Sequence, residues 1–103
     1  MNGFVIVLGL LASLAAAQPN TPSTISKHIA KILSRADGSS QATAYKVSSV
    51  RDEYDIVRTL GLTVKSQALV IGKRPYDAIT AVDATTGTER QIWFDISSFY
   101  PEF

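Results

Sequence analysis

Two aspartates near the end of the chain carry groups that could do chemistry if they lie side by side. Asp77 and Asp95 fall in consecutive segments that alternate polar and apolar residues, and a hairpin would place the two carboxylates directly opposite each other, next to Trp93. Opposed carboxylates repel, so such a pair usually holds a cation, a nearby base or a shared proton. The pair could therefore bind Ca²⁺ or flank a sugar that stacks on the indole. We favour the structural interpretation, in which the acids end two strands near Lys73 and Arg74, because a register error of one pair would separate them.

The chain offers few other groups for catalysis. His28 is the only histidine, and a general base or a catalytic triad needs a second group fixed against the imidazole, for which the sequence gives no signal. We therefore expect His28 to be a partly buried structural residue. The chain contains no Gly-x-Ser-x-Gly elbow, no His-Glu-x-x-His motif, no phosphate loop, no dinucleotide fingerprint and no cysteine. We predict no catalytic residue, no metal site and no cofactor.

The N-terminal segment 1–17 has the composition of a cleavable signal peptide. Its apolar, uncharged run at 4–14 is shorter than the roughly 20 residues that span a bilayer, and small residues follow it, as a signal peptidase requires. Cleavage after Ala17 would leave a linker at 18–22 and one small domain at 23–103. We expect this domain to be secreted or periplasmic, with no stable membrane span after processing.

The charges of the chain argue against a nucleic-acid partner. Ten basic and nine acidic residues give a net charge of +1, so no field of one sign is available for contacts with phosphates. Lys27, Lys31 and Arg35 recur at the spacing of one helix face and form a small basic stripe. We favour a solvated helix face over a contact with an anion or a membrane.

Two segments have the periodicity of helices that pack on a core. The first helix is expected over 24–36, where an apolar residue recurs every three or four positions. The second is expected over 50–60, with Ser49 as its N-cap and Gly61 as its left-handed end. Its inward residues are expected to be Val50, Tyr54, Val57 and Leu60. Between the helices, 44–47 could form a short edge strand.

The period of the pattern changes to two after the second helix. This change predicts three antiparallel strands, at 63–71, 76–83 and 88–96. A three-residue loop with Gly87 in the left-handed position would pair Ala84 with Thr88. The fold class is therefore α+β, with two helices packed on one face of a three- or four-stranded antiparallel β-meander.

The predicted register assigns each hairpin side chain to one of two faces. The more apolar face should meet the helices, and its members would be Tyr76, Ala78, Thr80, Val82, Arg90, Ile92, Phe94 and Ile96. The other face would set Trp93 beside Ile79 and Asp77 beside Asp95, and these four are the predicted binding residues. This second face is too apolar for a solvated surface. Either the aromatic tail at 99–103 or a partner, including a second copy in a homodimer, would cover it.

Several motifs in the second half of the chain resemble known families. Tyr76-Asp77, Thr86-Gly87 and Trp93-Phe94-Asp95-Ile96-Ser97 are similar to the C-terminal signature of short exported bacterial proteins of unknown function. This likeness covers about 50 to 103 and implies export but no activity. The turn Val82-Asp83-Ala84-Thr85-Thr86-Gly87 resembles that of PepSY domains, which implies inhibition of peptidases. Gln67-Ala68-Leu69-Val70-Ile71-Gly72 resembles the Gln-x-Val-x-Gly hairpin of cystatins.

The sequence therefore favours an exported, non-catalytic binding or interaction module whose working surface surrounds Trp93. Its partner would be an unknown protein or small molecule. One alternative is a PepSY-like or cystatin-like peptidase inhibitor that acts through the turn at 73–75 or by adding a strand to a sheet edge. Another alternative is a small carbohydrate-active enzyme that uses Asp77 and Asp95.

Overall fold

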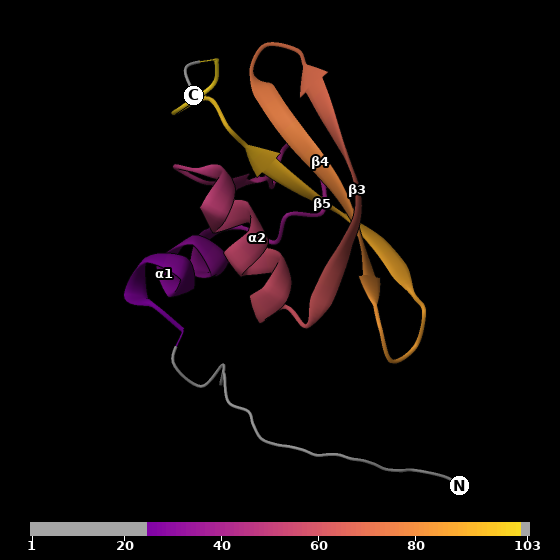
Figure 1. The fold of residues 1–103 in the computed structure, drawn as a ribbon. Helices are drawn as coiled ribbons and strands as arrows, with labels where there is room; N and C mark the ends of the chain where they lie inside the picture. Colours follow the sequence, from indigo (N-terminus) through magenta and orange to yellow (C-terminus); the bar gives the residue numbers. More distant parts are fainter. Residues whose placement is uncertain (1–24, 102–103) are drawn as a thin grey trace, which may run out of the picture.

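A computed structural model describes residues 25–101, which form two helices and a four-stranded sheet (Figure 1). The elements in chain order are α1 (Lys27–Arg35), β2 (Tyr45–Lys46), α2 (Val50–Thr59), β3 (Leu62–Ile71), β4 (Pro75–Asp83) and β5 (Glu89–Asp95). This confirms the predicted α+β class. The predicted signal peptide at 1–17 and linker at 18–22 lie outside the described residues. Within residues 25–101, no helix is long and apolar enough to cross a membrane.

Both helices begin at serine caps. The Ser26 hydroxyl accepts a hydrogen bond from the Ile29 amide at 3.1 Å, and the Ser49 hydroxyl accepts one from the Asp52 amide at 3.1 Å. Each bond satisfies an amide that has no partner within its helix. Gly61, with φ of 79°, follows the end of α2 as predicted.

The buried face of α2 agrees only in part with the prediction, since Val57 is buried and Leu60 packs against the core as expected. Val50 and Tyr54 are about 40% exposed, whereas Asp52, Glu53, Ile56 and Val57 are buried. The prediction of an inward Val50 and Tyr54 is therefore wrong. Two acidic residues share the buried face, so a count of apolar residues placed the stripe on a neighbouring face of the helix.

The sheet is mixed, with the strand order β2-β5-β4-β3. The pairs β3–β4 and β4–β5 are antiparallel, but β2 pairs with β5 in parallel, with Tyr45 opposite Phe94. The predicted edge strand at 44–47 therefore exists, but the prediction of an all-antiparallel meander is wrong. The chain passes through α2, β3 and β4 before it returns beside β2, and such a long connection allows either direction of pairing.

The β4–β5 turn has one residue more than predicted. The Asp83 amide donates to the Thr88 carbonyl at 2.9 Å, and the Gly87 amide donates to the Asp83 carbonyl at 2.7 Å. The Asp83 carboxylate also accepts hydrogen bonds from the amides of Thr85 and Thr86, at 2.8 and 3.3 Å. The loop therefore consists of residues 84–87, and Asp83, in place of Ala84, faces Thr88.

The shift of one residue exchanges the two faces of β4, because side chains alternate along a strand. Asp77, Ile79 and Ala81 are buried on the same face as Ile92 and Phe94. The prediction that Tyr76, Ala78, Thr80 and Val82 share a face with Phe94 is wrong. The faces predicted for Phe94 and Trp93 within β5 are consistent with their burial, since Phe94 is fully buried and Trp93 is only half-buried.

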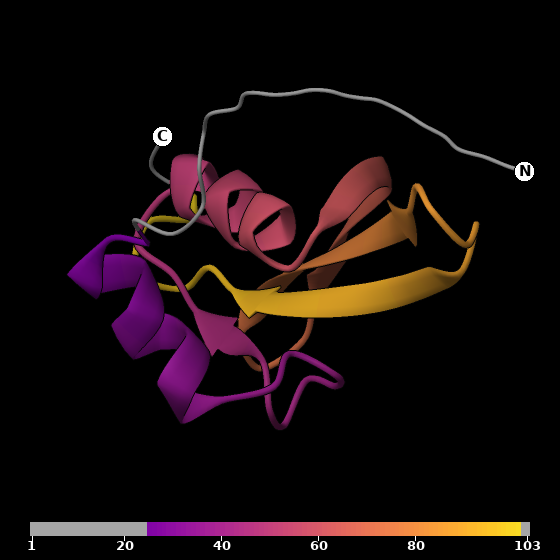
Figure 2. The same ribbon diagram turned by 90° about the horizontal axis from the view of Figure 1, so that it is seen from below.

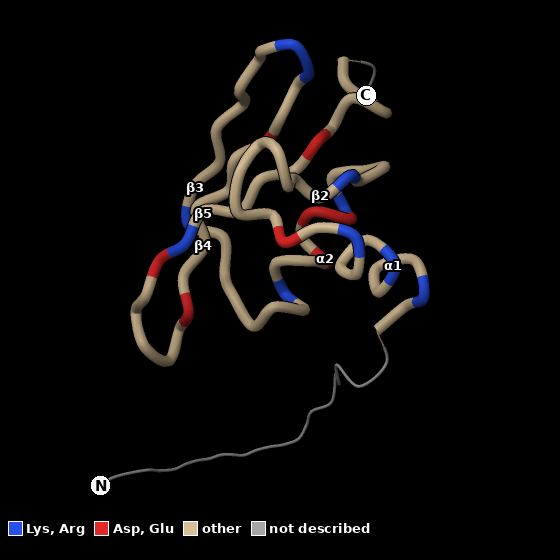
Figure 3. The backbone as a smooth tube through the Cα atoms, turned by 180° about the vertical axis from the view of Figure 1, so that it is seen from behind, with Lys and Arg blue, Asp and Glu red and all other residues tan. Residues whose placement is uncertain are grey.

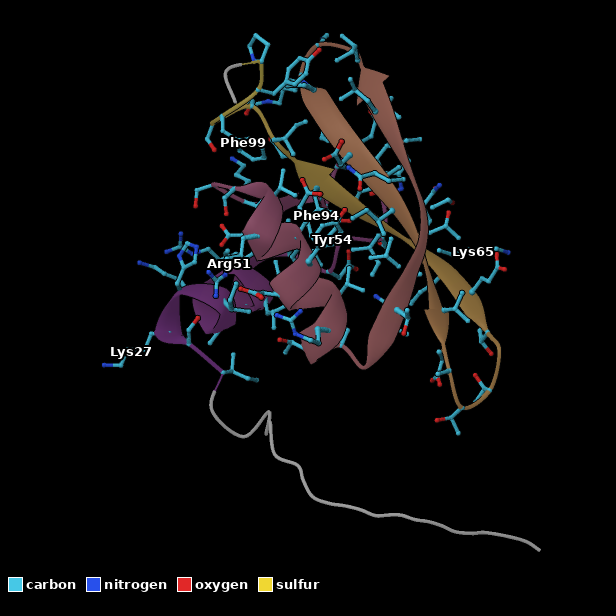
Figure 4. All side chains as sticks on the ribbon, viewed as in Figure 1. Lys27, Arg51, Tyr54, Lys65, Phe94 and Phe99 are labelled. Atoms are coloured by element: carbon cyan, nitrogen blue, oxygen red, sulfur yellow. The ribbon has the colours of Figure 1, made fainter. Side chains whose placement is uncertain are left out.

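One hydrophobic core joins both helices to the sheet. Its largest fully buried side chain is Phe94, which lies between α2 and the sheet (Figure 4). The other core residues are Ile29, Ile32, Tyr45, Val47, Ile56, Val57, Ile79, Ala81, Ile92 and Ile96. α2 packs against β3, and α1 packs against α2 and β2. Figure 2 shows both helices near one end of the sheet, while the β4–β5 turn extends away from them.

Candidate functional site

The two predicted site aspartates do not meet. Asp77 lies opposite Phe94, and Asp95 lies opposite Tyr76, so the two carboxylates project from opposite faces of the sheet. The hypothesis of an opposed carboxylate pair is therefore wrong, and its cause is the longer turn between β4 and β5. Within residues 25–101, no three acidic or histidine side chains are grouped so that they could hold a metal ion.

Asp95 has a structural role. One oxygen of its buried carboxylate accepts hydrogen bonds from the Ser97 amide at 2.9 Å and the Ser97 hydroxyl at 2.7 Å. The other oxygen pairs with the Arg74 guanidinium at 3.4 Å. Asp95 therefore holds the turn that follows β5 and fixes it to the β3–β4 turn.

Asp77 lies beside a second buried acid that sequence reasoning missed. The Asp77 carboxylate accepts a hydrogen bond from the side-chain NH₂ of Gln67 at 3.3 Å. The side-chain carbonyl of Gln67 accepts one from the Tyr54 hydroxyl at 3.1 Å. Glu53 is fully buried, and within residues 25–101 neither of its carboxyl oxygens has a hydrogen-bond partner. Burial is the main cause that raises the pKa of Glu53 to about 9, and the close approach and negative charge of the Asp77 carboxyl add to it, although the two groups do not reach hydrogen-bond geometry.

Two neighbouring carboxyl groups, one with a raised pKa, are an arrangement that some hydrolases use. Glu53, however, has no exposed surface, so it cannot touch a substrate in this conformation. Its position in the buried stripe of α2 could have revealed it, because Glu53 precedes Ile56 and Val57 at the spacing of one helix face.

His28 is exposed, so the prediction of a partly buried histidine is wrong, and its imidazole has a partner that the sequence did not reveal. Its Nε2 lies 3.0 Å from an Asp52 carboxylate oxygen that also accepts hydrogen bonds from the Ser48 amide and hydroxyl, each at 2.9 Å. Burial of Asp52 opposes ionisation, but the hydrogen bonds from Ser48 and His28 outweigh it and lower the pKa of Asp52. The Ser48 hydroxyl bonds the acid and not the imidazole, so the three residues do not form a nucleophilic triad. They connect α1 to α2.

Trp93 lies on the opposite face of the sheet from Phe94. Its ring packs edge-to-face against Tyr76, with centroids 6.2 Å apart and planes at 80°, and its backbone lies opposite Ala78. Ile79 is fully buried on the other face, so the prediction that Ile79 lies beside Trp93 is wrong. The neighbours of the half-buried indole thus include an aromatic ring and a small side chain.

The strand β3 forms one edge of the sheet, and no strand of residues 25–101 pairs with its outer side. Its first half contains a register shift between Val64 and Ser66 and an ion pair between Lys65 and Glu89. Lys65 points outward from the sheet in Figure 4. The second half, residues 66–71, has no charge, no proline and no glycine.

Comparisons with known proteins identify the family. No curated protein and no solved structure matches the chain. A family model described as a domain of unknown function, DUF4919, matches residues 1–102. This match covers almost the whole chain, and the chain therefore belongs to the DUF4919 family.

Proposed function

We propose that the chain is an exported, non-catalytic interaction module that binds an extended segment of another secreted or periplasmic protein along the free edge of β3. One observation carries this proposal: six consecutive uncharged residues, 66–71, form a sheet edge that no strand of the described residues pairs with, and on it Leu69 and Ile71 are 51% and 60% exposed. An edge strand presents a row of backbone N–H and C=O groups that another strand can pair with.

The two halves of β3 differ in their protection against pairing. Natural sheets block edge pairing with bulges, lysine side chains and prolines. The first half of β3 has such devices, in the irregularity next to Lys65 and in the lysine itself. Residues 66–71 have none of them. The contrast within one strand supports a binding role for the second half.

Side chains on both sheet faces would contact an added strand. Leu69 and Ile71 project from the face that also carries Asp77, and the exposed Ala68 and the half-buried Val70 project from the other. On that second face, a row of pairs leads from Ala68 through Ala78 to Trp93. The helices, which we propose to cover the first face, would leave the indole available to the partner. A partner strand with apolar side chains on both faces fits this edge best.

The enzyme alternative has little support, because its two carboxylates lie on opposite sheet faces. A peptidase inhibitor remains a special case of the same binding mode, with a peptidase as the partner and strand addition as the contact. Inhibition of a panel of peptidases would distinguish this case from a module that binds other proteins.

The proposal is tested by binding followed by amide exchange. Protein from the exported fraction of the producing cells is captured on the immobilised chain, identified, purified and added to the isotopically labelled chain. We expect hydrogen exchange to slow at alternate amides of residues 66–71, since the outward N–H groups would become hydrogen-bonded. The variant Ile71→Lys should weaken binding at least about tenfold, because it places a charge on the edge.

Ile25→Lys is the matched control, because Ile25 is another exposed isoleucine, 46% accessible, outside the sheet. It should retain binding within about twofold, as expected of a surface change far from the contact. Protection confined to another surface, equal loss in both variants, or the absence of any bound protein would refute the edge-binding proposal.

A further inference from the structure

A cavity of about 540 Å³ lies between α1 and the segment that leads into β2. Figure 2 shows this segment beside α1, at the opposite edge of the sheet from β3. The α1 side contributes His28, Lys31, Ile32, Arg35 and Ala36, and the other side contributes Ala42, Thr43, Ala44 and Lys46. The cavity is therefore separate from the edge proposed to bind a protein.

The charged side chains that line this cavity are all basic. Lys31 and Arg35 are one helical turn apart and face the same side of α1. Lys46 joins them from β2, where it alternates with the buried Tyr45. Figure 3 shows the basic positions of α1 at the end of the molecule opposite the β4–β5 turn. Among residues 25–101, no acidic side chain lines the cavity.

The three cations also have no ion-pair partner in the described part of the chain. Within residues 25–101, no acidic group pairs with Lys31, Arg35 or Lys46, whereas four other basic side chains make ion pairs. These four are Arg51, Arg58, Lys65 and Arg74. Like charges that converge repel each other, and an anion between them would remove this cost.

The acids nearest in the sequence are already engaged. The Asp37 carboxylate accepts hydrogen bonds from the Ser39 amide at 3.0 Å and the Ser39 hydroxyl at 2.8 Å. The Asp52 carboxylate is held by Ser48 and His28, as described above. Neither acid lines the cavity, so neither neutralises the basic side chains that would contact a ligand there.

The wall opposite α1 is fixed before any ligand binds. The Gly38 amide donates to the Thr43 carbonyl at 2.8 Å, and the Thr43 amide donates to the Ser40 carbonyl at 3.2 Å. Gly38 has φ of 67°, and a Cβ at this position would overlap the Tyr45 ring. The loop thus packs closely on the core, and a ligand would lose little binding energy to ordering it.

We propose that this cavity binds a small anion with at least two negative charges, on carboxylate, phosphate or sulfate groups. Lys31 and Lys46 would hold these groups as point charges, and the planar fork of Arg35 could bind one of them through two hydrogen bonds. Ile32, Ala36 and the two alanines of the loop supply nonpolar surface for the body of the ligand. The volume suits a molecule of metabolite size.

The test is a titration of the full chain at low ionic strength, followed through the amide resonances of the isotopically labelled protein. The probes are citrate, pyrophosphate and sulfate, which distinguish the three anionic groups, with acetate as the monovalent comparison. We expect saturable shifts at residues 42–46 with at least one of the polyvalent probes. Acetate should bind at least about tenfold more weakly, because it meets only one of the cations.

Variants then identify the charges that matter. Lys31→Gln and Lys46→Gln should each weaken binding about three- to tenfold, because each removes one charge–charge contact. Lys27→Gln is the matched control: Lys27 lies on the same helix but extends away from the molecule in Figure 4 and does not line the cavity. It should change binding by less than about twofold, since charges remote from the contact act weakly through water. The proposal is overturned if no polyvalent probe produces saturable shifts at millimolar concentrations, or if Lys27→Gln weakens binding as much as Lys31→Gln.

Discussion

At the scale of single residues, the buried carboxyl of Glu53 is the least expected feature of the chain. A fully buried acid destabilises a fold, and the cost grows as the acid ionises. Because the pKa of Glu53 rises to about 9, the folded protein holds a proton that the unfolded chain releases above about pH 4.5. The pH dependence of stability should therefore report on this one group.

Between pH 5 and 9, the free energy of unfolding should fall as pH rises, by up to about 1.4 kcal/mol per pH unit. Because the pKa of Glu53 is raised in the folded state, the contribution of its protonated form to stability is complete below the unfolded pKa. This contribution is lost as the pH rises toward the folded pKa. Glu53→Gln should flatten this slope and make the protein more stable than the original chain at pH 9. Chemical denaturation at several pH values measures both effects.

Glu89→Gln serves as the control for this prediction, because Glu89 is an exposed glutamate on the sheet. It should leave the slope unchanged. A slope in Glu53→Gln as steep as that of the original chain would show that another group titrates. The lower limit of this pH range is 5 because the pKa of Asp52 is lowered in the folded state. Under more acidic conditions, Asp52 therefore makes the free energy of unfolding fall as the pH falls.

At the scale of elements, the sequence predicted the existence and type of every helix and strand that the structure describes. The predicted ends of α2, β3 and β4 agree with the structure to within one residue, because serine caps, glycine ends and the change from a helical to a strand period are local signals. Relations between elements were predicted less well. The parallel pairing of β2 and the contact between His28 and Asp52 join segments that are far apart in the sequence.

In the β4–β5 hairpin, an error of one residue in the predicted loop length assigns every side chain of β4 to the wrong sheet face. Loops of three and four residues both accommodate a left-handed Gly87, so the glycine alone does not determine the register. The Asp83 carboxylate stabilises the four-residue loop, because it accepts hydrogen bonds from two amides of the turn. The four-residue loop places Ile79 in the core and separates Asp77 from Asp95.

Asp83→Ala should therefore destabilise the domain by about 1 kcal/mol, which is typical for the loss of a side chain that caps backbone amides. The measurement is the midpoint of chemical denaturation. Thr85→Ala in the same exposed turn is the comparison and should stay within about 0.5 kcal/mol of the original chain. Equal effects of the two substitutions would contradict the role assigned to Asp83.

At the scale of the whole molecule, stability depends on one modest core without disulfides. β5 lies at the centre of that core: it pairs with β2 on one side and β4 on the other, and it carries Phe94 and Ile92. A chain that ends before Glu89 should show no cooperative thermal transition, because the β3–β4 pair would lose Phe94 and Ile92 from its core and β2 would lose the strand that joins it to the sheet. Circular dichroism during heating measures this, and a sharp transition in the truncated chain would contradict it.

The central position of β5 also sets an order of events during biosynthesis. The last strand of the described chain lies in the middle of the sheet, so β2 and the two helices cannot complete their packing while the ribosome is still adding residues before Glu89. A polypeptide that stays open until β5 has been synthesised suits a translocation channel that passes only unfolded chains. If the chain is exported as proposed above, the late synthesis of β5 would postpone folding until the far side of the membrane.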